Sequence, residues 1–255
     1  MVTNKIAHLF IIHIVNNLDD TVISKKKILS DVLVMIDDLK SDECFVKLFM
    51  GIFCPDSKRY FSEEELEAFS CLKEHSTSKK DADQRHQEIL SIVTKPIETF
   101  FEENMLYYLL DTRKNHLLPR VLGARIELGS IKESDCMDEM LRQIQKKHHY
   151  DGKSQMLIGH PDLHRNIKDL VKQDATQKDS KLDFCSQIAS IISKNFLECI
   201  ETRAVWIIVE LLENENTAKL IKPEVAKNKD ALKALVKKGK GTKGVEVILK
   251  ALTKK

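Results

Sequence analysis

The stretch TRAVWIIVELL, residues 202–212, has a counterpart forty positions later in TKGVEVILKAL, residues 242–252. Both begin with threonine and a basic residue, and both continue with apolar residues spaced along one face of a helix. The same frame recurs in TRKNHLLPRVL, residues 112–122, and more weakly from Asp162, Glu43 and Lys5. The sequence therefore predicts a recurring helix that starts near residues 5, 43, 112, 162, 202 and 242.

A second amphipathic stretch leads into these copies, so the repeating unit is a pair of helices. The leading stretches cover residues 21–38, 80–103, 132–147, 182–200 and 223–237. Helix pairs that recur about every 40 residues are typical of an α-solenoid, in which each pair buries its apolar face against its neighbours. We expect an all-α, armadillo-type solenoid of two- to three-helix repeats across residues 1–255, with an insertion or a degenerate pair around residues 61–72. A bundle of unrelated helices is the alternative.

Several short signals place the ends of these helices. Asp19, Asp20 and Thr21 form a candidate N-cap cluster, and Ser62 with Glu65 fits a capping box. Pro223 suits a first helical turn. Loops are expected at residues 55–60, 75–78, 148–155 and 175–181, and residues 239–243 are expected to form the turn between the last two helices.

Composition and charge narrow the class of protein. Only eight Gly and five Pro occur in 255 residues, which favours helices over many short strands. Six scattered cysteines without a CxxC pair indicate reduced thiols in an intracellular protein. The apolar run at residues 6–15 is too short to span a bilayer, so no membrane partner is expected.

The C-terminal end is strongly basic. Residues 219–255 carry twelve Lys against three acidic residues, a net charge of +9, whereas the remaining residues sum to −7. This asymmetry suggests a polyanionic partner, and a solvated basic face explains it equally well.

Several segments together resemble the Puf-A family, also called pumilio homolog 3 and, in fungi, the Puf-six group. They are STSKKD at residues 76–81 followed by Arg85 and Glu88-Ile89-Leu90, LDDT at residues 18–21, His160-Pro161, and TKGVEVIL at residues 242–249. Each is short, and their order and spacing along nearly the whole chain carry the resemblance.

The resemblance implies pumilio-like repeats, a CPL-like region within residues 130–255, and correspondence to the C-terminal part of a longer family protein. It also implies RNA or DNA binding with little sequence preference, nucleolar location, a role in large ribosomal subunit biogenesis and rRNA processing, and in some relatives translational repression. The expected partners are structured or double-stranded pre-ribosomal RNA, DNA and ribosome assembly proteins, bound by a monomer in the nucleus and nucleolus.

The repeats do not carry a base-reading code. Sequence-specific pumilio repeats hold a base with two polar side chains and one stacking side chain. The corresponding positions hold Asn115, His116 and Pro119 in one repeat, Val205, Trp206 and Val209 in another, and Val245, Glu246 and Leu249 in the last. Most of these residues cannot bond to a base edge. Trp206 could stack on an unpaired base, but its apolar neighbours favour packing in the core.

Contacts with the phosphate backbone remain, and they require basic side chains on one face. Arg113 with Lys114, Arg203, and Lys243 recur at the same repeat position and are the best candidates. The full predicted set is Lys25, Lys26, Lys27, Lys79, Lys80, Arg85, Arg113, Lys114, Lys146, Lys147, Arg203, Lys237, Lys238, Lys240 and Lys243. For each cluster alone, a solvated face is the competing interpretation.

Catalytic interpretations find little support. His148 and His149 have no Cys at metal-ligand spacing, Cys185 and Cys199 have no evident activating base, and the glycines at 239 and 241 lack P-loop spacing. We expect no enzyme activity, metal or cofactor. The predicted function is a nucleic-acid-binding scaffold, and the alternative is a protein-interaction solenoid that docks a partner helix or acidic segment.

Overall fold

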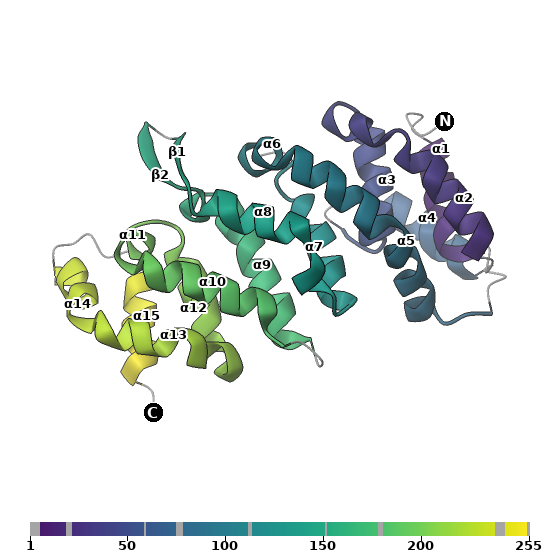
Figure 1. The fold of residues 1–255 in the computed structure, drawn as a ribbon. Helices are drawn as coiled ribbons and strands as arrows, with labels where there is room; N and C mark the ends of the chain where they lie inside the picture. Colours follow the sequence, from purple (N-terminus) through teal and green to yellow (C-terminus); the bar gives the residue numbers. More distant parts are fainter. Residues whose placement is uncertain are drawn as a thin grey trace. The chain divides into compact units, whose positions relative to one another are not determined.

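The computed structural model describes residues 6–18, 22–58, 60–74, 79–111, 114–150, 152–177, 181–237 and 243–253. The chain folds into two compact units, Met1–Phe100 and Phe101–Lys255 (Figure 1). Both units are built from helices, as the sequence predicts, and the described residues form one small two-stranded sheet. None of the described helices is both long enough and apolar enough to cross a membrane.

The N-terminal unit is built around α3, the helix of the strongest early apolar run. Its elements are α1 (Ala7–His13), the π-helix η1 (Ile14–Leu18), α2 (Val22–Leu33), the 3₁₀ helix η2 (Ile36–Lys40), α3 (Glu43–Phe53), α4 (Glu63–Glu74) and all but the last three residues of α5 (Ala82–Glu103). α1 packs against α3, where Ile12 lies directly over Gly51. Asn16 Nδ2 donates to Gly51 O over 3.0 Å, which ties η1 to the same helix.

The C-terminal unit stacks helices in chain order. Its elements are α6 (Met105–Leu110), α7 (Leu118–Glu127), η3 (Ile131–Glu133), α8 (Asp135–Ile144), β1 (Lys147–Tyr150), β2 (Lys153–Met156), η4 (Leu157–Gly159), α9 (Leu163–Thr176), α10 (Asp183–Lys194), α11 (Phe196–Ile200), α12 (Val205–Glu213), α13 (Glu215–Lys227), α14 (Lys229–Lys237) and α15 (Lys243–Thr253). α7 packs on α9, α9 on α12, and α12 on α15. These helices form one continuous row, and α10 packs beside it against α9, α12 and α13 (Figure 1).

Two polar side chains, one buried and one half-buried, join neighbouring helices of this row. Asn166 Nδ2 of α9 donates to Asn115 O and Oδ1, just before α7, over 3.2 and 3.0 Å. Gln173 Nε2, also on α9, donates to Gly123 O and Glu127 Oε1 of α7 over 3.1 and 2.9 Å. Because these bonds link residues about fifty positions apart, they fix the register in which one repeat stacks on the next.

α1, α3, α9, α12 and α15 begin at residues 7, 43, 163, 205 and 243, and α7 begins at residue 118, six residues after the predicted start at 112. The all-helical fold class is confirmed. The capping box is also present, since Ser62 N donates to Glu65 Oε2 over 2.8 Å and Glu65 N donates to Ser62 Oγ over 3.2 Å. The division of the chain into individual pumilio repeats stays a prediction.

Two local predictions are wrong. Residues 147–156, expected to form a helix end and a loop, make an antiparallel hairpin that pairs Lys147 with Met156 and Tyr150 with Lys153. The tight turn uses Gly152 at a positive φ of 70°, which glycine adopts without strain. Pro223 lies inside α13 because the helix begins earlier, where Asn214 Oδ1 accepts a hydrogen bond from Asn216 N. The predicted N-cap cluster at 19–21, the loop at 75–78 and most of the turn at 239–243 lie outside the described residues.

Candidate nucleic-acid interface

The predicted basic residues of the N-terminal unit do not form one cationic surface. Lys26 and Lys27 are exposed on α2, and Lys27 Nζ lies 3.4 Å from the Asp31 carboxylate. The side chain of Lys25 lies outside the described residues. Part of the charge of α2 is thus neutralised within the helix itself.

The cluster around residues 79–85 is mostly engaged within the protein. Lys79 is exposed, but Lys80 Nζ binds both oxygens of Glu88 over 2.8 and 2.9 Å. Arg85 is buried, with 8% of its surface exposed. The structure therefore corrects the expectation that Arg85 belongs to a solvent-facing phosphate contact.

In the C-terminal unit, the predicted cations fall into separate groups. Lys146, Lys147 and Lys237 are exposed, and Lys147 Nζ lies 3.0 Å from Glu198 Oε2. Lys114 is half-buried. The residues Arg113, Lys238 and Lys240 lie outside the described part of the chain.

Arg203 and Lys243, forty positions apart in sequence, line the same cavity of about 430 Å³. Both side chains are exposed. Trp206 forms part of the same wall, and Gln155 of β2 lies on the lining as well. The structure thus brings together two of the basic residues that the repeat frame singled out and places an aromatic ring beside them.

Two glycines make this arrangement possible by letting backbones approach closely. A Cβ on Gly244 would lie 2.8 Å from Val205 Cγ1, so the first turn of α15 rests directly on the first turn of α12. A Cβ on Gly159 of η4 would lie 2.6 Å from Thr202 Oγ1. The segment that enters α12 is therefore held between η4 and α15, and Arg203 is positioned at the opening between them.

The position of Trp206 differs from the prediction. The side chain is half-buried on the cavity wall, because Val205, Ile208 and Val209 occupy the buried face of α12. Trp206 shares the outer face with Glu210, one turn later, whose carboxylate lies 3.2 Å from Lys168 Nζ. This i, i+4 relation to a charged residue was the sequence signal for a partly exposed ring.

The hairpin adds residues that the sequence did not single out for binding. Gln155 contributes an amide to the cavity, and Lys153 is exposed on β2. The lining also includes the exposed residue Glu201. The positive charge of the cavity is therefore confined to the part of the rim that holds Arg203 and Lys243.

A buried histidine lies behind this edge. Burial lowers the pKa of His164, and the nearby cations Arg165 and Arg203 lower it further, whereas hydrogen bonding to the His160 carbonyl opposes the shift. His164 Nδ1 lies 3.1 Å from His160 O. The imidazole is therefore kept neutral, so no buried cation lies behind the exposed Arg203 near neutral pH.

The chemistry of the described residues gives no metal site or reactive thiol at this edge. No group of three or more His, Cys, Asp or Glu side chains among them is arranged to hold a metal ion. Burial raises the pKa of the Cys199 thiol to about 12, with a contribution from Glu198, and burial also raises the pKa of Cys185. Both thiols are therefore protonated and inert at neutral pH.

The comparisons with known protein families and with known sequences agree with one another. The sequence pattern of the CPL (NUC119) domain matches residues 46–183, more than half of the chain. The match lies further toward the N-terminus than the region 130–255 that the sequence resemblance indicated. Pumilio homolog 3 of Homo sapiens is 25% identical over 258 residues, which cover 97% of this chain and 38% of the relative. Pumilio homolog 3 of Mus musculus is 21% identical, with the same two coverages.

Solved structures show the same fold. The crystal structure of human Puf-A superimposes with a TM-score of 0.79 at 21% identity, covering 98% of this chain and 48% of that one. The crystal structure of human Puf-A in complex with DNA gives a TM-score of 0.74 at 20% identity, covering 98% and 47%. The chain spans less than half the length of these relatives. It belongs to the CPL (NUC119) domain family and is a helical-repeat protein of the Puf-A type.

Proposed function

We propose that this chain is a nucleic-acid-binding scaffold without catalytic activity, which grips RNA, and also DNA, through the phosphate backbone with little sequence preference. The observation that carries the proposal is the cavity that the exposed Arg203 and Lys243 line together with the half-buried Trp206. Two cations and an aromatic ring on one edge match the chemistry of phosphates and of an unstacked base. That a similar protein, human Puf-A, is known in complex with DNA supports the same class of ligand.

The buried state of the base-reading positions supports binding without a sequence code. Asn115, Pro119, Val205, Val209 and Val245 are buried. Asn115 accepts hydrogen bonds from Asn166, which occupies its carbonyl groups within the protein. Since these side chains cannot reach a base edge, discrimination between bases would have to come from other positions.

The cellular role follows from the resemblance to the Puf-A family. We propose a function in large ribosomal subunit biogenesis and rRNA processing in the nucleolus, with structured pre-ribosomal RNA and assembly proteins as partners, and translational repression as a further role. A monomeric scaffold with a basic edge suits this work, because it contacts RNA backbones without selecting one sequence.

Charge-neutral variants test the assignment of this edge. The variants are Arg203→Gln, Lys243→Gln and their double variant, with Lys172→Gln as the control because Lys172 is an exposed lysine of α9 away from the cavity. Each phosphate contact contributes about 0.9 to the slope of log affinity against log salt on a duplex. The double variant is therefore expected to bind a mixed-sequence RNA duplex more weakly and to reduce that slope by about 1 to 2.

Trp206→Leu separates the stacking contribution from the charge contribution. Base stacking on an aromatic side chain is worth about 1–3 kcal/mol per base. We expect this variant to weaken binding of single-stranded RNA more than binding of a duplex, whose bases are already stacked.

The double variant of Arg203→Gln and Lys243→Gln provides the decisive outcome. If it keeps its fold and binds duplex RNA as tightly as Lys172→Gln, the assignment of this edge is contradicted.

A further inference from the structure

The helix α6 exposes side chains that its composition would normally bury. Its sequence is MLYYLL, so all six of its residues are hydrophobic. A helix that is hydrophobic all round is normally buried all round. The buried residues of α6 are Met105, Tyr108 and Leu109. The exposed ones are Leu106, Tyr107 and Leu110, with 38%, 44% and 38% of their surface open to solvent. One face of this hydrophobic helix is therefore left uncovered in part.

The exposed side chains of α6 continue a stripe that begins at the end of α5. Helical hydrogen bonding crosses the junction, since Tyr108 N donates to Asn104 O over 3.3 Å. The stripe follows the spacing i, i+1, i+4, i+5 and i+8, which is one face of a helix. This α6 stripe consists of the exposed residues Glu102, Glu103, Leu106, Tyr107 and Leu110, all of the C-terminal unit.

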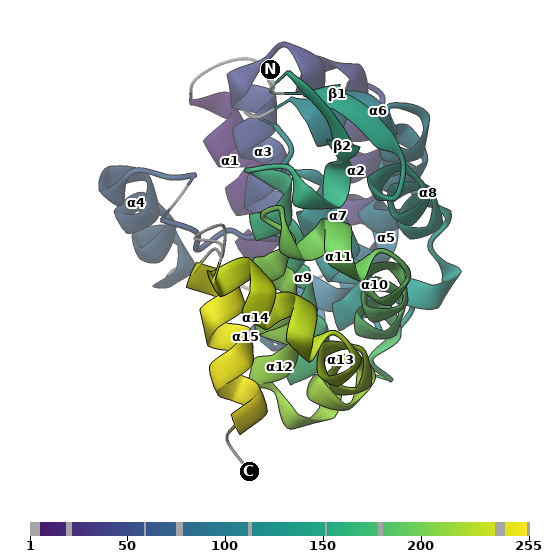
Figure 2. The same cartoon turned by 90° about the vertical axis from the view of Figure 1, so that its left-hand side faces the viewer.

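The charge around the hydrophobic part of the α6 stripe is negative. The carboxylates of Glu102 and Glu103 form no ion pair with another described residue. Residues 96–112 include four acidic residues and no basic one. The helix α8, which packs against α6 (Figures 1 and 2), carries three acidic residues against one arginine. The hydrophobic side chains therefore lie in an acidic setting.

This charge decides between the possible occupants of the α6 stripe. A nucleic acid would be repelled by the carboxylates of Glu102 and Glu103. A second copy of the chain, paired through the same stripe, would bring four unpaired carboxylates together. A basic segment of a partner protein meets both the charge and the hydrophobic surface. The net charge of −7 on residues 1–218 also favours the approach of a basic partner.

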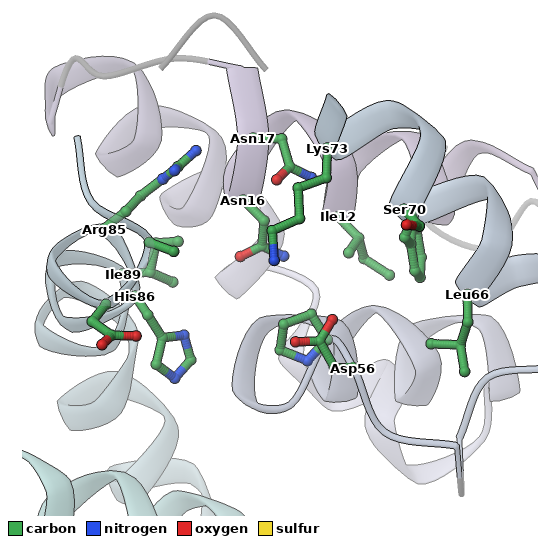
Figure 3. A pocket seen from close by; sticks show the side chains of 14 residues that line it. Ile12, Asn16, Asn17, Asp56, Leu66, Ser70, Lys73, Arg85, His86 and Ile89 are labelled. Atoms are coloured by element: carbon green, nitrogen blue, oxygen red, sulfur yellow. The ribbon is translucent and has the colours of Figure 1, made fainter. Parts of the chain in front are cut away.

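The cavity of about 450 Å³ between α4 and α5 gives no comparable indication of a partner. The exposed residues Lys73, Asp56 and Asp83 line it together (Figure 3). Because charges of both signs lie on its lining, the cavity does not select the charge of an occupant. The α6 stripe does, since its charged residues are of one sign.

We propose that the α6 stripe binds a short segment of a partner protein that carries basic residues next to large hydrophobic side chains. The hydrophobic side chains pack on Leu106, Tyr107 and Leu110, and the basic residues approach Glu102 and Glu103. The stripe is about 12 Å long, so two turns of a helix or about four extended residues cover it. This surface is independent of the nucleic-acid interface proposed around Arg203 and Lys243.

Selection from a library of random short peptides on the intact chain tests the proposal. Enriched peptides are expected to share Lys or Arg within a few positions of Leu, Ile or Phe. Their binding is measured by fluorescence polarisation with labelled peptide. We expect Leu106→Gln with Leu110→Gln to weaken it about tenfold or more, because less hydrophobic surface is buried. Glu102→Gln with Glu103→Gln should weaken it about three- to tenfold, and the difference from the parent should shrink as salt is added.

The control for the charge variant is Glu63→Gln with Glu64→Gln, a pair of adjacent exposed glutamates on α4. The glutamate variant keeps the test decisive even if the leucine variant fails to fold, because both carboxylates are exposed and make no ion pair with a described residue. The proposal is overturned if no peptide is enriched or if the enriched peptides lack the basic and hydrophobic combination. Equal binding to the glutamate variant and to its control also overturns it.

Two further outcomes assign the stripe to another occupant and overturn the proposal. One is dimerisation of the chain, seen by sedimentation, that the leucine variant abolishes. The other is loss of duplex RNA binding in a folded leucine variant. The variant Arg203→Gln with Lys243→Gln is expected to leave peptide affinity unchanged, so this proposal and the nucleic-acid interface fail separately.

Discussion

A Cβ on Gly244 would lie 2.8 Å from Cγ1 and 3.0 Å from Cγ2 of Val205, closer than side-chain carbons normally approach. Gly244 lies in the first turn of α15, next to Lys243. Val205 is the first residue of α12, two positions after Arg203. Because Val205 is fully buried and β-branched, it has little freedom to move aside. The edge that Arg203 and Lys243 form therefore requires a residue without a side chain at position 244.

Gly244→Ala is expected to destabilise the C-terminal unit and to weaken RNA binding. Overpacking costs about 1–3 kcal/mol, and the better helix propensity of alanine returns up to about 1 kcal/mol. The free energy of unfolding, measured in urea, should fall by about 1 kcal/mol. In the background of Val205→Ala the same change should cost nothing, since the clashing methyl groups are gone. Equal destabilisation in both backgrounds would show that the close contact is not the cause.

Asn166→Ala removes the polar link between α9 and the turn before α7. It deletes two buried donations to Asn115 and leaves that residue's side-chain carbonyl without this partner. Loss of a buried hydrogen-bond partner costs about 1–3 kcal/mol. Chemical denaturation should show this loss, whereas Asn195→Ala, which removes only a half-buried bond within α10, should cost less.

Acidification should destabilise both units through buried histidines. Burial is the main cause that lowers the pKa of His164 and the sole cause that lowers the pKa of His13. Folding therefore favours the neutral imidazole, and this stability is present above the unfolded pKa of about 6.5 and is lost as pH falls through the lowered folded pKa. The melting temperature should drop between about pH 7.5 and about pH 5.5.

Variants identify the histidine responsible for this loss. His164→Gln should reduce the drop in melting temperature that acidification causes in the C-terminal unit. His149→Gln, at an exposed position of β1, should leave that drop unchanged. A pH profile of His164→Gln that parallels the parent protein would refute the role of His164.

The cysteines should differ sharply in reactivity. Cys71 is exposed on α4, whereas Cys136, Cys185 and Cys199 are buried. Because burial raises the pKa of Cys199 to about 12, its thiolate is scarce at neutral pH, and the shielded sulfur is also hard to reach. With a chromogenic disulfide reagent, the fastest phase should vanish in Cys71→Ser, and the three buried thiols should react only as the C-terminal unit unfolds.

The sequence was informative where the structure follows a helical period. The apolar spacing shared by residues 202–212 and 242–252 predicted the stacked helices, because burying one face against a neighbouring repeat requires that spacing. The sequence pattern did not predict the hairpin of β1 and β2. The alternation at residues 147–156 is weak and polar, although Asp151-Gly152 is a strong turn signal between two short strands.

Burial of single residues was harder to predict than the helices themselves. Arg85 was assigned to the surface by its type, but the structure buries it, and Trp206 was assigned to the interior by its neighbours, but the structure leaves it only half-buried. Each outcome depends on long-range packing: α4 and α5 enclose Arg85 beside a cavity, and α12 rotates Trp206 outward to bury Ile208. Short-range patterns do not contain this information.

Binding of the purified chain to unrelated single-stranded and duplex RNAs across a salt series tests the central claim most directly. We predict affinities within about threefold between sequences of the same form, falling steeply and linearly on a logarithmic salt scale. A strong preference for one sequence, or no binding at about 50 mM salt, would contradict the account of a scaffold that grips the phosphate backbone.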